Sequence, residues 1–273
     1  MAQRFKKKYG QNFLKDRDGV LYRIAEIAGV TAEDHILEIG PGAGALTEIL
    51  LEKAKSVTAV EIDTDLERGL RERFRNNPRF TLVMGDFLKT DLREILEEKG
   101  LSGRKIKVVA NIPYYITSPI LQKLIDFRAL IDCVFVMVQK EVGERICAKR
   151  GKARGILTLA VEYYGEAAGH FIIGKECFTP VPKVDSALIS ICFYEKTSLP
   201  ALIPEAVFFH YIHAAFAGKR KTLVNNLAGL GFEKKTLAEI LRETGIAENE
   251  RAENVSLAEY TALISRLEAL KKT

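Results

Sequence analysis

The sequence predicts a doubly wound α/β fold with a mostly parallel sheet, followed by a small helical domain. Residues 35–50 run from a strand through a glycine-rich turn into a helix, which is a common entry to a nucleotide site in such folds. Three more short apolar strands follow this first one, and each of the four strands ends at a glycine or a polar residue. After Tyr194 the composition shifts, and the later stretches have helical spacing.

The first helix is predicted over residues 16–29, with Asp16 or Asp18 as its cap. A strand at 35–39 leads directly into Gly40-Pro41-Gly42-Ala43-Gly44-Ala45. Glycines let a ligand approach the backbone closely, and the helix behind them offers free N–H groups. The first, third and sixth residues of this turn also satisfy the G-x-G-x-x-A spacing of dinucleotide sites, so a nicotinamide oxidoreductase stays open as an alternative.

The next three strands are predicted at 57–60, 80–84 and 106–110, and they end in Glu61, Asp86 and Asn111. An acid about 20 residues after the glycines commonly accepts hydrogen bonds from ribose hydroxyls, and Glu61 fits this position. Asp86 can accept from an adenine amine while Phe87 or Ile62 packs on the ring. Because the carboxyl ends of parallel strands lie along one edge, these three side chains and the glycine turn are expected to converge.

The segment Asn111-Ile112-Pro113-Tyr114-Tyr115 suits a planar base that carries an exocyclic amine. The asparagine offers an amide oxygen as acceptor, and the proline sets the direction of the carbonyls around it. The tyrosines offer flat faces for stacking. Taken alone, the segment is equally consistent with a turn before a helix that starts near 117–119. The convergence of four strand ends favours a binding site.

The sheet is predicted to close with a buried strand at 133–138, a helix at 139–149, and a hairpin at its edge from stretches near 170–173 and 187–191. Residues 195–200 resemble a linker, which places a catalytic domain at 1–197 and a small helical domain at 198–273. Its helices are expected at 204–216, 220–228, 234–245 and 256–270. For the basic stretches 149–154 and 219–221, solvated surface and phosphate contact both stay open.

The composition limits which partners and which cellular compartment the protein is expected to have. The chain has 273 residues, with 41 Lys and Arg against 36 Asp and Glu and a net charge of +5, which permits a nucleic-acid partner without requiring one. Its four cysteines form no CxxC pair, which argues against a zinc site or a disulfide framework and for a reducing compartment. No signal peptide and no bilayer-spanning apolar run is evident, so a cytoplasmic protein without a membrane partner is expected.

The chemistry of the strand ends favours methyl transfer over hydride transfer. None of the four histidines has a clear catalytic setting, and no hydride partner site is evident. S-adenosyl-L-methionine needs an acid for its ribose, a contact for its adenine, and glycines near its amino-acid end. A nucleophile site must then lie beside the sulfonium, and Asn-x-Pro-Tyr suits an amino nitrogen there.

The chain resembles the ribosomal RNA adenine N6-dimethyltransferase family. The matching segments are Gln11-Asn12-Phe13-Leu14, 38–44, Glu61-Ile62-Asp63, Gly85-Asp86, 111–115 and 178–187. Two more, 218–223 and 251–256, resemble the bacterial small-subunit branch more than the antibiotic-resistance branch that modifies large-subunit RNA. The resemblance implies a seven-stranded sheet of the S-adenosylmethionine-dependent methyltransferase type.

The resemblance also implies site residues. S-adenosyl-L-methionine would be contacted by Asn12, Leu14, Gly40, Glu61, Asp86 and Asn111. Asn111 and the Pro113 carbonyl would hold the amine of the target adenine. Tyr114 would stack on the base, and Phe178 would cover its other face. No metal is expected.

The implied activity is dimethylation of two adjacent adenosines near the 3′ end of small-subunit (16S) ribosomal RNA, by a monomer acting on a pre-ribosomal particle, with a role in small-subunit biogenesis. Two further alternatives stay open beside the oxidoreductase. One is the same chemistry on large-subunit RNA. The other is an RNA-binding assembly or transcription factor that keeps the fold.

Overall fold

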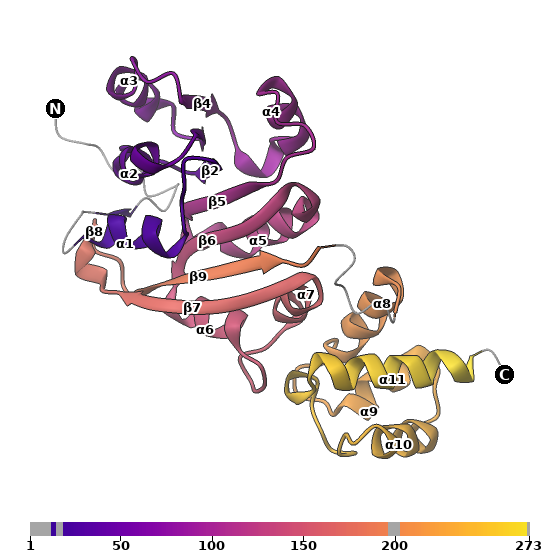
Figure 1. Cartoon of the computed structure of the whole chain (residues 1–273). Helices are drawn as coiled ribbons and strands as arrows, with labels where there is room; N and C mark the ends of the chain where they lie inside the picture. The colour runs from indigo at the N-terminus through magenta and orange to yellow at the C-terminus, as the bar shows by residue number, and fades with distance from the viewer. Residues whose placement is uncertain (1–11, 15–18, 196–202, 272–273) are drawn as a thin grey trace. The chain divides into compact units, whose positions relative to one another are not determined.

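The computed structural model describes residues 12–14, 19–195 and 203–271. Within them the chain forms two compact units. The first comprises residues up to Gly143 together with Gly165–Phe193, and the second comprises Glu144–Tyr164 together with the chain from Tyr194 onward. Figure 1 shows the sheet of the first unit and the helices of the second.

A seven-stranded sheet in the order β4-β3-β2-β5-β6-β9-β7 forms the first unit. Its strands are β2 (His35–Ile39), β3 (Ser56–Glu61), β4 (Phe80–Met84), β5 (Ile106–Asn111), β6 (Ile131–Gln139), β7 (Gly165–Ile173) and β9 (Ser186–Phe193). Strands β4, β3, β2, β5 and β6 pair in parallel with one another in this order. Strand β9 is antiparallel to both β6 and β7. The predicted doubly wound, mostly parallel sheet with a hairpin at one edge is therefore confirmed.

Helices cover both faces of this sheet. They are α1 (Val20–Ile27), α2 (Ala45–Lys53), α3 (Thr64–Arg73), α4 (Leu92–Glu98) and α5 (Thr117–Asp126). Successive side chains of a strand point to opposite faces. Ile36 accordingly packs in the cluster that holds Leu21 and Leu50 of α1 and α2, whereas Leu37 lies against Leu92 of α4. Burial on both faces explains why these strands are continuous apolar runs.

The hairpin strand β9 carries a disulfide that contradicts the sequence-based expectation. Cys133 of β6 and Cys192 of β9 are directly paired across the ladder, and they are joined by a disulfide. The two residues lie 59 positions apart in the sequence. Their spacing therefore carries no sign of the contact, because only the antiparallel register of β6 and β9 brings them together.

Two short strands tie the N-terminal segment to the loop between β7 and β9. β1 (Phe13–Leu14) pairs antiparallel with β8 (Phe178–Thr179), so that Phe13 lies opposite Thr179 and Leu14 opposite Phe178. Leu14 and Phe178 both enter the core cluster beneath the sheet. The Asn-Phe-Leu segment is thereby fixed at the carboxyl edge of the parallel strands.

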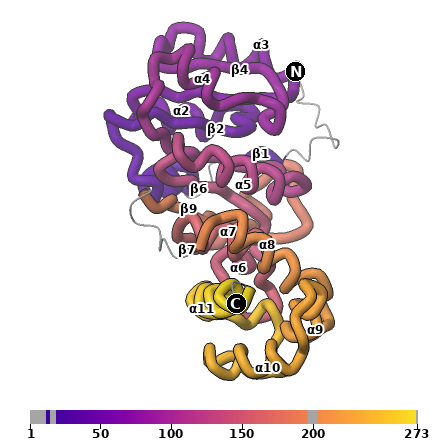
Figure 2. Tube along the Cα trace, turned by 90° about the vertical axis from the view of Figure 1, so that its right-hand side faces the viewer, coloured from indigo at the N-terminus to yellow at the C-terminus, as the bar shows by residue number. Residues whose placement is uncertain are grey.

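The second unit is helical (Figure 2). It contains α7 (Ile156–Tyr164), α8 (Glu205–Ala215), α9 (Leu223–Leu227), α10 (Lys234–Glu243) and α11 (Leu257–Leu270). Ser256 and Glu259 form a capping box at the start of α11. Sequence reasoning missed α7, because this helix is buried on most sides and has no clear polar face.

The units differ from the predicted domain division in two respects, since the second unit resumes at Tyr194 and also takes in Glu144–Tyr164. Leu159 of α7 packs in the same core cluster as Phe208 and Leu263, so 144–164 group with the C-terminal helices. The predicted boundary itself, between 197 and 198, lies outside the described residues. In the basic loop at 149–154, Arg150 pairs with Glu259, and buried Arg154 pairs with Glu162. No helix in the described part is long and apolar enough to cross a membrane.

Candidate active site

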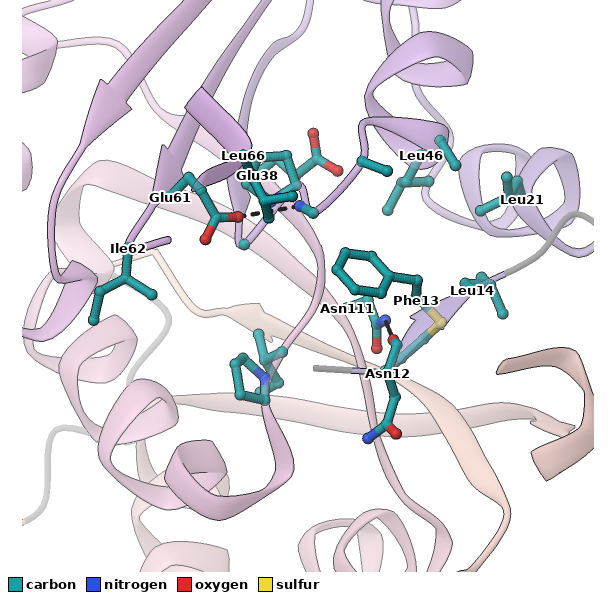
Figure 3. Close-up of a pocket in the computed structure, with 18 of the residues that line it drawn as sticks. Asn12, Phe13, Leu14, Leu21, Glu38, Leu46, Glu61, Ile62, Leu66 and Asn111 are labelled. Atoms are coloured by element: carbon teal, nitrogen blue, oxygen red, sulfur yellow. Dashed lines mark hydrogen bonds between the residues drawn. The ribbon is translucent and has the colours of Figure 1, made fainter. Parts of the chain in front are cut away.

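A pocket opens at the carboxyl edge of the sheet, where the strand order reverses between β2 and β5 (Figure 3). The chain winds outward from β2 to β4 and then returns to β5 on the other side of β2. The loops after β2 and β5 therefore diverge and leave a crevice, which is where open α/β sheets bind ligands. Of the predicted cofactor residues, the pocket lining contains Asn12, Leu14, Gly40, Glu61 and Asn111.

Glu61 links the glycine-rich turn to the end of β3. Its Oε2 accepts a hydrogen bond from the Gly42 N–H at 3.1 Å, and its Oε1 accepts one from the Asp63 N–H at 2.8 Å. Burial raises the pKa of Glu61, while these backbone hydrogen bonds act in the opposite direction. The side chain is thus a preorganised acceptor beside a backbone N–H group, as a ribose hydroxyl requires.

Glu38, at the end of β2, is a second carboxyl group in the pocket wall. It is 2% exposed, and its Oε2 accepts a hydrogen bond from Thr47 Oγ1 at 2.6 Å. Burial raises the pKa of Glu38 to about 8, opposed by the Thr47 hydrogen bond and assisted by the nearby charge of Glu61. The group therefore holds a proton at neutral pH, and a cation bound in the pocket would lower its pKa and favour release of that proton to solvent.

Asn111 joins the end of β5 to the N-terminal segment. Its Nδ2 donates a hydrogen bond to the Asn12 carbonyl at 3.1 Å. This bond fixes the orientation of the amide and leaves Oδ1 as the acceptor atom on the opposite side. The Pro113 carbonyl, two residues on, accepts from the Ile116 N–H at 3.2 Å, which fixes its direction at the start of a 3₁₀ turn. Two oxygen acceptors thus lie near each other at the pocket edge.

The two tyrosines of this segment have different environments. Tyr114 lines the pocket, and its hydroxyl lies 2.5 Å from Ser186 Oγ at the start of β9. Tyr115 is 56% exposed. Of the two rings, therefore, it is Tyr114 that lines the pocket, and its predicted stacking on a base stays a prediction.

Phe13 occupies part of the pocket. Its ring lies between Asn111 and Leu66 in Figure 3, against the backbone of Gly42. The cavity measures about 110 Å³, well below the roughly 300–1,000 Å³ of most small-molecule sites. The ring therefore takes up part of the space beside the glycine turn.

Two predicted site residues lie outside the pocket lining. Asp86 follows β4 at the edge of the sheet, where its side chain accepts a hydrogen bond from the Leu88 N–H at 3.0 Å. Phe178 is 1% exposed and packs in the core cluster with Leu14 and Leu21. In this arrangement neither side chain faces the cavity.

Sequence reasoning gave Phe13 and Glu38 no role of their own, although both line the pocket. Phe13 is one position from two predicted ligand residues, so its place next to the site could have been inferred. The burial of Glu38 had a visible sign too, because a charged residue within the apolar run 36–39 needs a partner. Within the described residues, no cluster of His, Cys, Asp and Glu could hold a metal ion.

We expect Gly42→Ala to weaken binding of S-adenosylmethionine about tenfold or more. Gly42 has a φ of +60°, where an L-residue is strained by roughly 1–2 kcal/mol, so the free alanine variant would relax the turn and would have to regain the strained geometry to bind the ligand. An added Cβ would also lie 2.8 Å from two ring carbons of Phe13. Titration calorimetry measures the change in Kd.

Gly69→Ala in α3 is the matched control. Its Cβ meets no atom within 4 Å, and alanine favours the helix, so its Kd should equal that of the unaltered protein. A Gly42→Ala protein that binds within twofold of this control would show that the glycine turn does not approach the ligand.

The fold and the pocket together define an S-adenosylmethionine-dependent methyltransferase. Its marks are an acid at the end of β3, a glycine turn after β2, and Asn-x-Pro-Tyr starting at the last residue of β5, all in the same crevice. The model of the family "Ribosomal RNA adenine dimethylase" matches residues 2–269. The chain belongs to this family.

Two relatives are similar in sequence to this chain over nearly its whole length. Ribosomal RNA small subunit methyltransferase A of Fusobacterium nucleatum is 54% identical over 268 residues, covering 98% of this chain and 99% of that protein. The protein of the same name from Geobacter metallireducens is 44% identical over 270 residues, covering 98% and 97%.

Two solved structures are also similar. The 23S rRNA methyltransferase ErmE has a TM-score of 0.74 at 27% identity, covering 94% of this chain and all of that one. A dimethyladenosine transferase from Plasmodium falciparum has a TM-score of 0.76 at 28% identity, covering 95% and 98%.

Proposed function

We propose that this enzyme transfers methyl groups from S-adenosyl-L-methionine to the N6 amine of two adjacent adenosines near the 3′ end of small-subunit (16S) ribosomal RNA, giving N6,N6-dimethyladenosine. One observation carries the proposal: the acceptors of Asn111 and Pro113 open on the same pocket as Glu61 and the glycine turn. The relatives named for the small subunit are 54% and 44% identical, whereas the 23S enzyme is 27% identical. The small subunit is therefore favoured over the large.

The residues of the pocket suit the cofactor. Glu61 would accept from ribose hydroxyls, Gly40 would allow close approach of the backbone, and Asn12, Leu14 and Asn111 would line the amino-acid end. Asp86 is assigned to the adenine amine on family resemblance and on its place after β4. S-adenosylmethionine, when bound, supplies a methyl group activated by its sulfonium. Glu38 adds a buried carboxyl group that suits this positive charge.

The protein's contribution at the target is chiefly positional. An adenine amine is a weak nucleophile, because its lone pair is delocalised into the ring. Asn111 Oδ1 and the Pro113 carbonyl would accept its two hydrogens and favour a pyramidal nitrogen whose lone pair points at the methyl group. Tyr114 would stack on the base, which has to leave its own stack to enter the pocket. Alignment of the two reacting groups then supplies much of the rate.

Phe178 is assigned to the other face of the base on family resemblance alone, since the side chain is buried here. No strong base is required, because the amine becomes acidic once it is methylated. A monomethylated amine keeps one hydrogen and its lone pair, so the same pocket can carry out a second transfer. We further propose that the enzyme works as a monomer in the cytoplasm on a pre-ribosomal particle.

The test is methyl transfer from labelled S-adenosylmethionine to unmethylated small subunits, with large-subunit RNA alongside. Nuclease digestion would map the label. We expect dimethyladenosine in small-subunit RNA alone, at two adjacent positions. Label in large-subunit RNA would move the activity to the resistance branch. Binding of cofactor without transfer to either RNA would favour the RNA-binding assembly factor.

A further inference from the structure

The hydroxyl groups of Tyr114 and Ser186 form a contact that no step described so far uses. Ser186 is 0% exposed and begins β9, a strand whose other residues are almost all apolar. A buried hydroxyl in such a strand needs a hydrogen-bond partner. Ser186 Oγ has the Tyr114 hydroxyl at 2.5 Å, across 72 positions of sequence.

Ser186 is a rigid anchor. Its backbone pairs with Gln139 of β6 on one side and with Ile173 of β7 on the other, so the strand is held from both directions. Tyr114, by contrast, begins a three-residue 3₁₀ turn, which holds a side chain less firmly than a sheet does. The hydrogen bond therefore ties the far end of the Tyr114 ring to the sheet.

The tie fixes the direction of the ring axis. A tyrosine side chain turns about two bonds, and its hydroxyl oxygen lies on the axis of the second, so the hydrogen bond holds the first torsion and thereby the place of the ring. Tyr115, the next residue, has a ring that is largely exposed. Burial raises the pKa of Tyr114, so its hydroxyl stays protonated at neutral pH and the contact is between two neutral groups.

We propose that Ser186 is a positioning residue for methyl transfer, which holds the Tyr114 ring in the place where it can stack on the target adenine. The inference rests on the proposed function of the same site. Ser186 touches neither base nor cofactor in this scheme, and it acts only through Tyr114. Its removal should therefore change transfer to the base and leave cofactor binding intact.

A double-mutant cycle tests the proposal. Ser186→Ala and Tyr114→Phe each remove one end of the hydrogen bond, and Tyr114→Phe keeps the ring. We expect each to lower kcat for methyl transfer to small subunits on the order of tenfold, with the Kd of S-adenosylmethionine unchanged. The double variant should be no slower than the slower single variant, because both changes break the same bond.

Ser190→Ala is the matched control. Ser190 lies on the same strand, is also buried, and bonds to His170 Nε2 at 2.9 Å. This variant should keep kcat within twofold. Thermal unfolding of every variant separates loss of fold from loss of rate. If Ser186→Ala is no slower than Ser190→Ala, or if the two losses multiply in the double variant, the proposal is wrong.

A second readout works without turnover. Stacking quenches fluorescent purines, and 2,6-diaminopurine keeps the 6-amine that Asn111 and Pro113 would hold, so the fluorescence of an RNA oligonucleotide with this base at the target position reports stacking in the pocket of the protein loaded with S-adenosylhomocysteine. We expect weaker quenching with Ser186→Ala and unchanged quenching with Ser190→Ala. If the unaltered protein transfers no methyl group, the proposed function fails, and the quenching still decides the role of Ser186.

Discussion

Asn111→Ala is expected to lower the rate of methyl transfer by about a hundredfold to a thousandfold while the protein keeps its fold. The change removes Oδ1, the acceptor that would hold the target amine, and it removes the donor to the Asn12 carbonyl. The side chain sits at the end of β5, so the strand ladder itself needs no part of it. Single-turnover transfer from labelled S-adenosylmethionine measures the rate.

Asn76→Ala is the control for this prediction, since Asn76 is exposed at a turn and is not among the residues that line the pocket. It should transfer methyl groups as fast as the unaltered protein. Circular dichroism and cofactor titration show whether each variant is folded and binds ligand. A folded Asn111→Ala protein with full activity would contradict the acceptor mechanism.

Glu38→Gln is expected to remove the fall in stability that Glu38 causes between pH 4.5 and 8. In the folded protein the pKa of Glu38 is about 8, because the carboxyl is buried, whereas its ordinary value is 4.5. Between these values the unfolded chain has lost the proton and the folded chain keeps it. Folding then takes up a proton, so the free energy of unfolding falls as pH rises through this window.

The size of this effect follows from the shift. A shift from 4.5 to about 8 corresponds to roughly 4–5 kcal/mol across the window. Glutamine keeps the shape and the hydrogen bond with Thr47 but carries no titrating proton, so the variant should gain stability over the unaltered protein at pH 8 and little at pH 5. Urea unfolding of the protein without cofactor at both pH values measures the difference.

Glu26→Gln on α1 serves as the control, because Glu26 is an exposed carboxylate of the same unit. Its stability should follow the unaltered protein at both pH values. An equal stability difference between Glu38→Gln and the unaltered protein at pH 5 and pH 8 would show that Glu38 is ionised in the folded state.

The sequence by itself determined the architecture of the catalytic unit and most of the pocket. Apolar runs at 35–39, 57–60 and 106–110 favour a sheet buried on both faces, and the run at 80–84 is half-buried at the edge of that sheet. Parallel strands bring their carboxyl ends to one edge, so Gly40, Glu61 and Asn111 had to lie close together. The family segments in the same order then pointed to adenine methylation.

The tertiary structure alone decided the contacts between segments that are distant in the chain. The Cys133–Cys192 disulfide, the Tyr114–Ser186 hydrogen bond and the β1–β8 pairing each depend on register. A strand shifted by one residue turns every side chain to the other face, and local sequence does not encode that choice. Packing likewise placed Phe13 in the pocket and the α7 helix with the C-terminal helices, because burial depends on which faces meet.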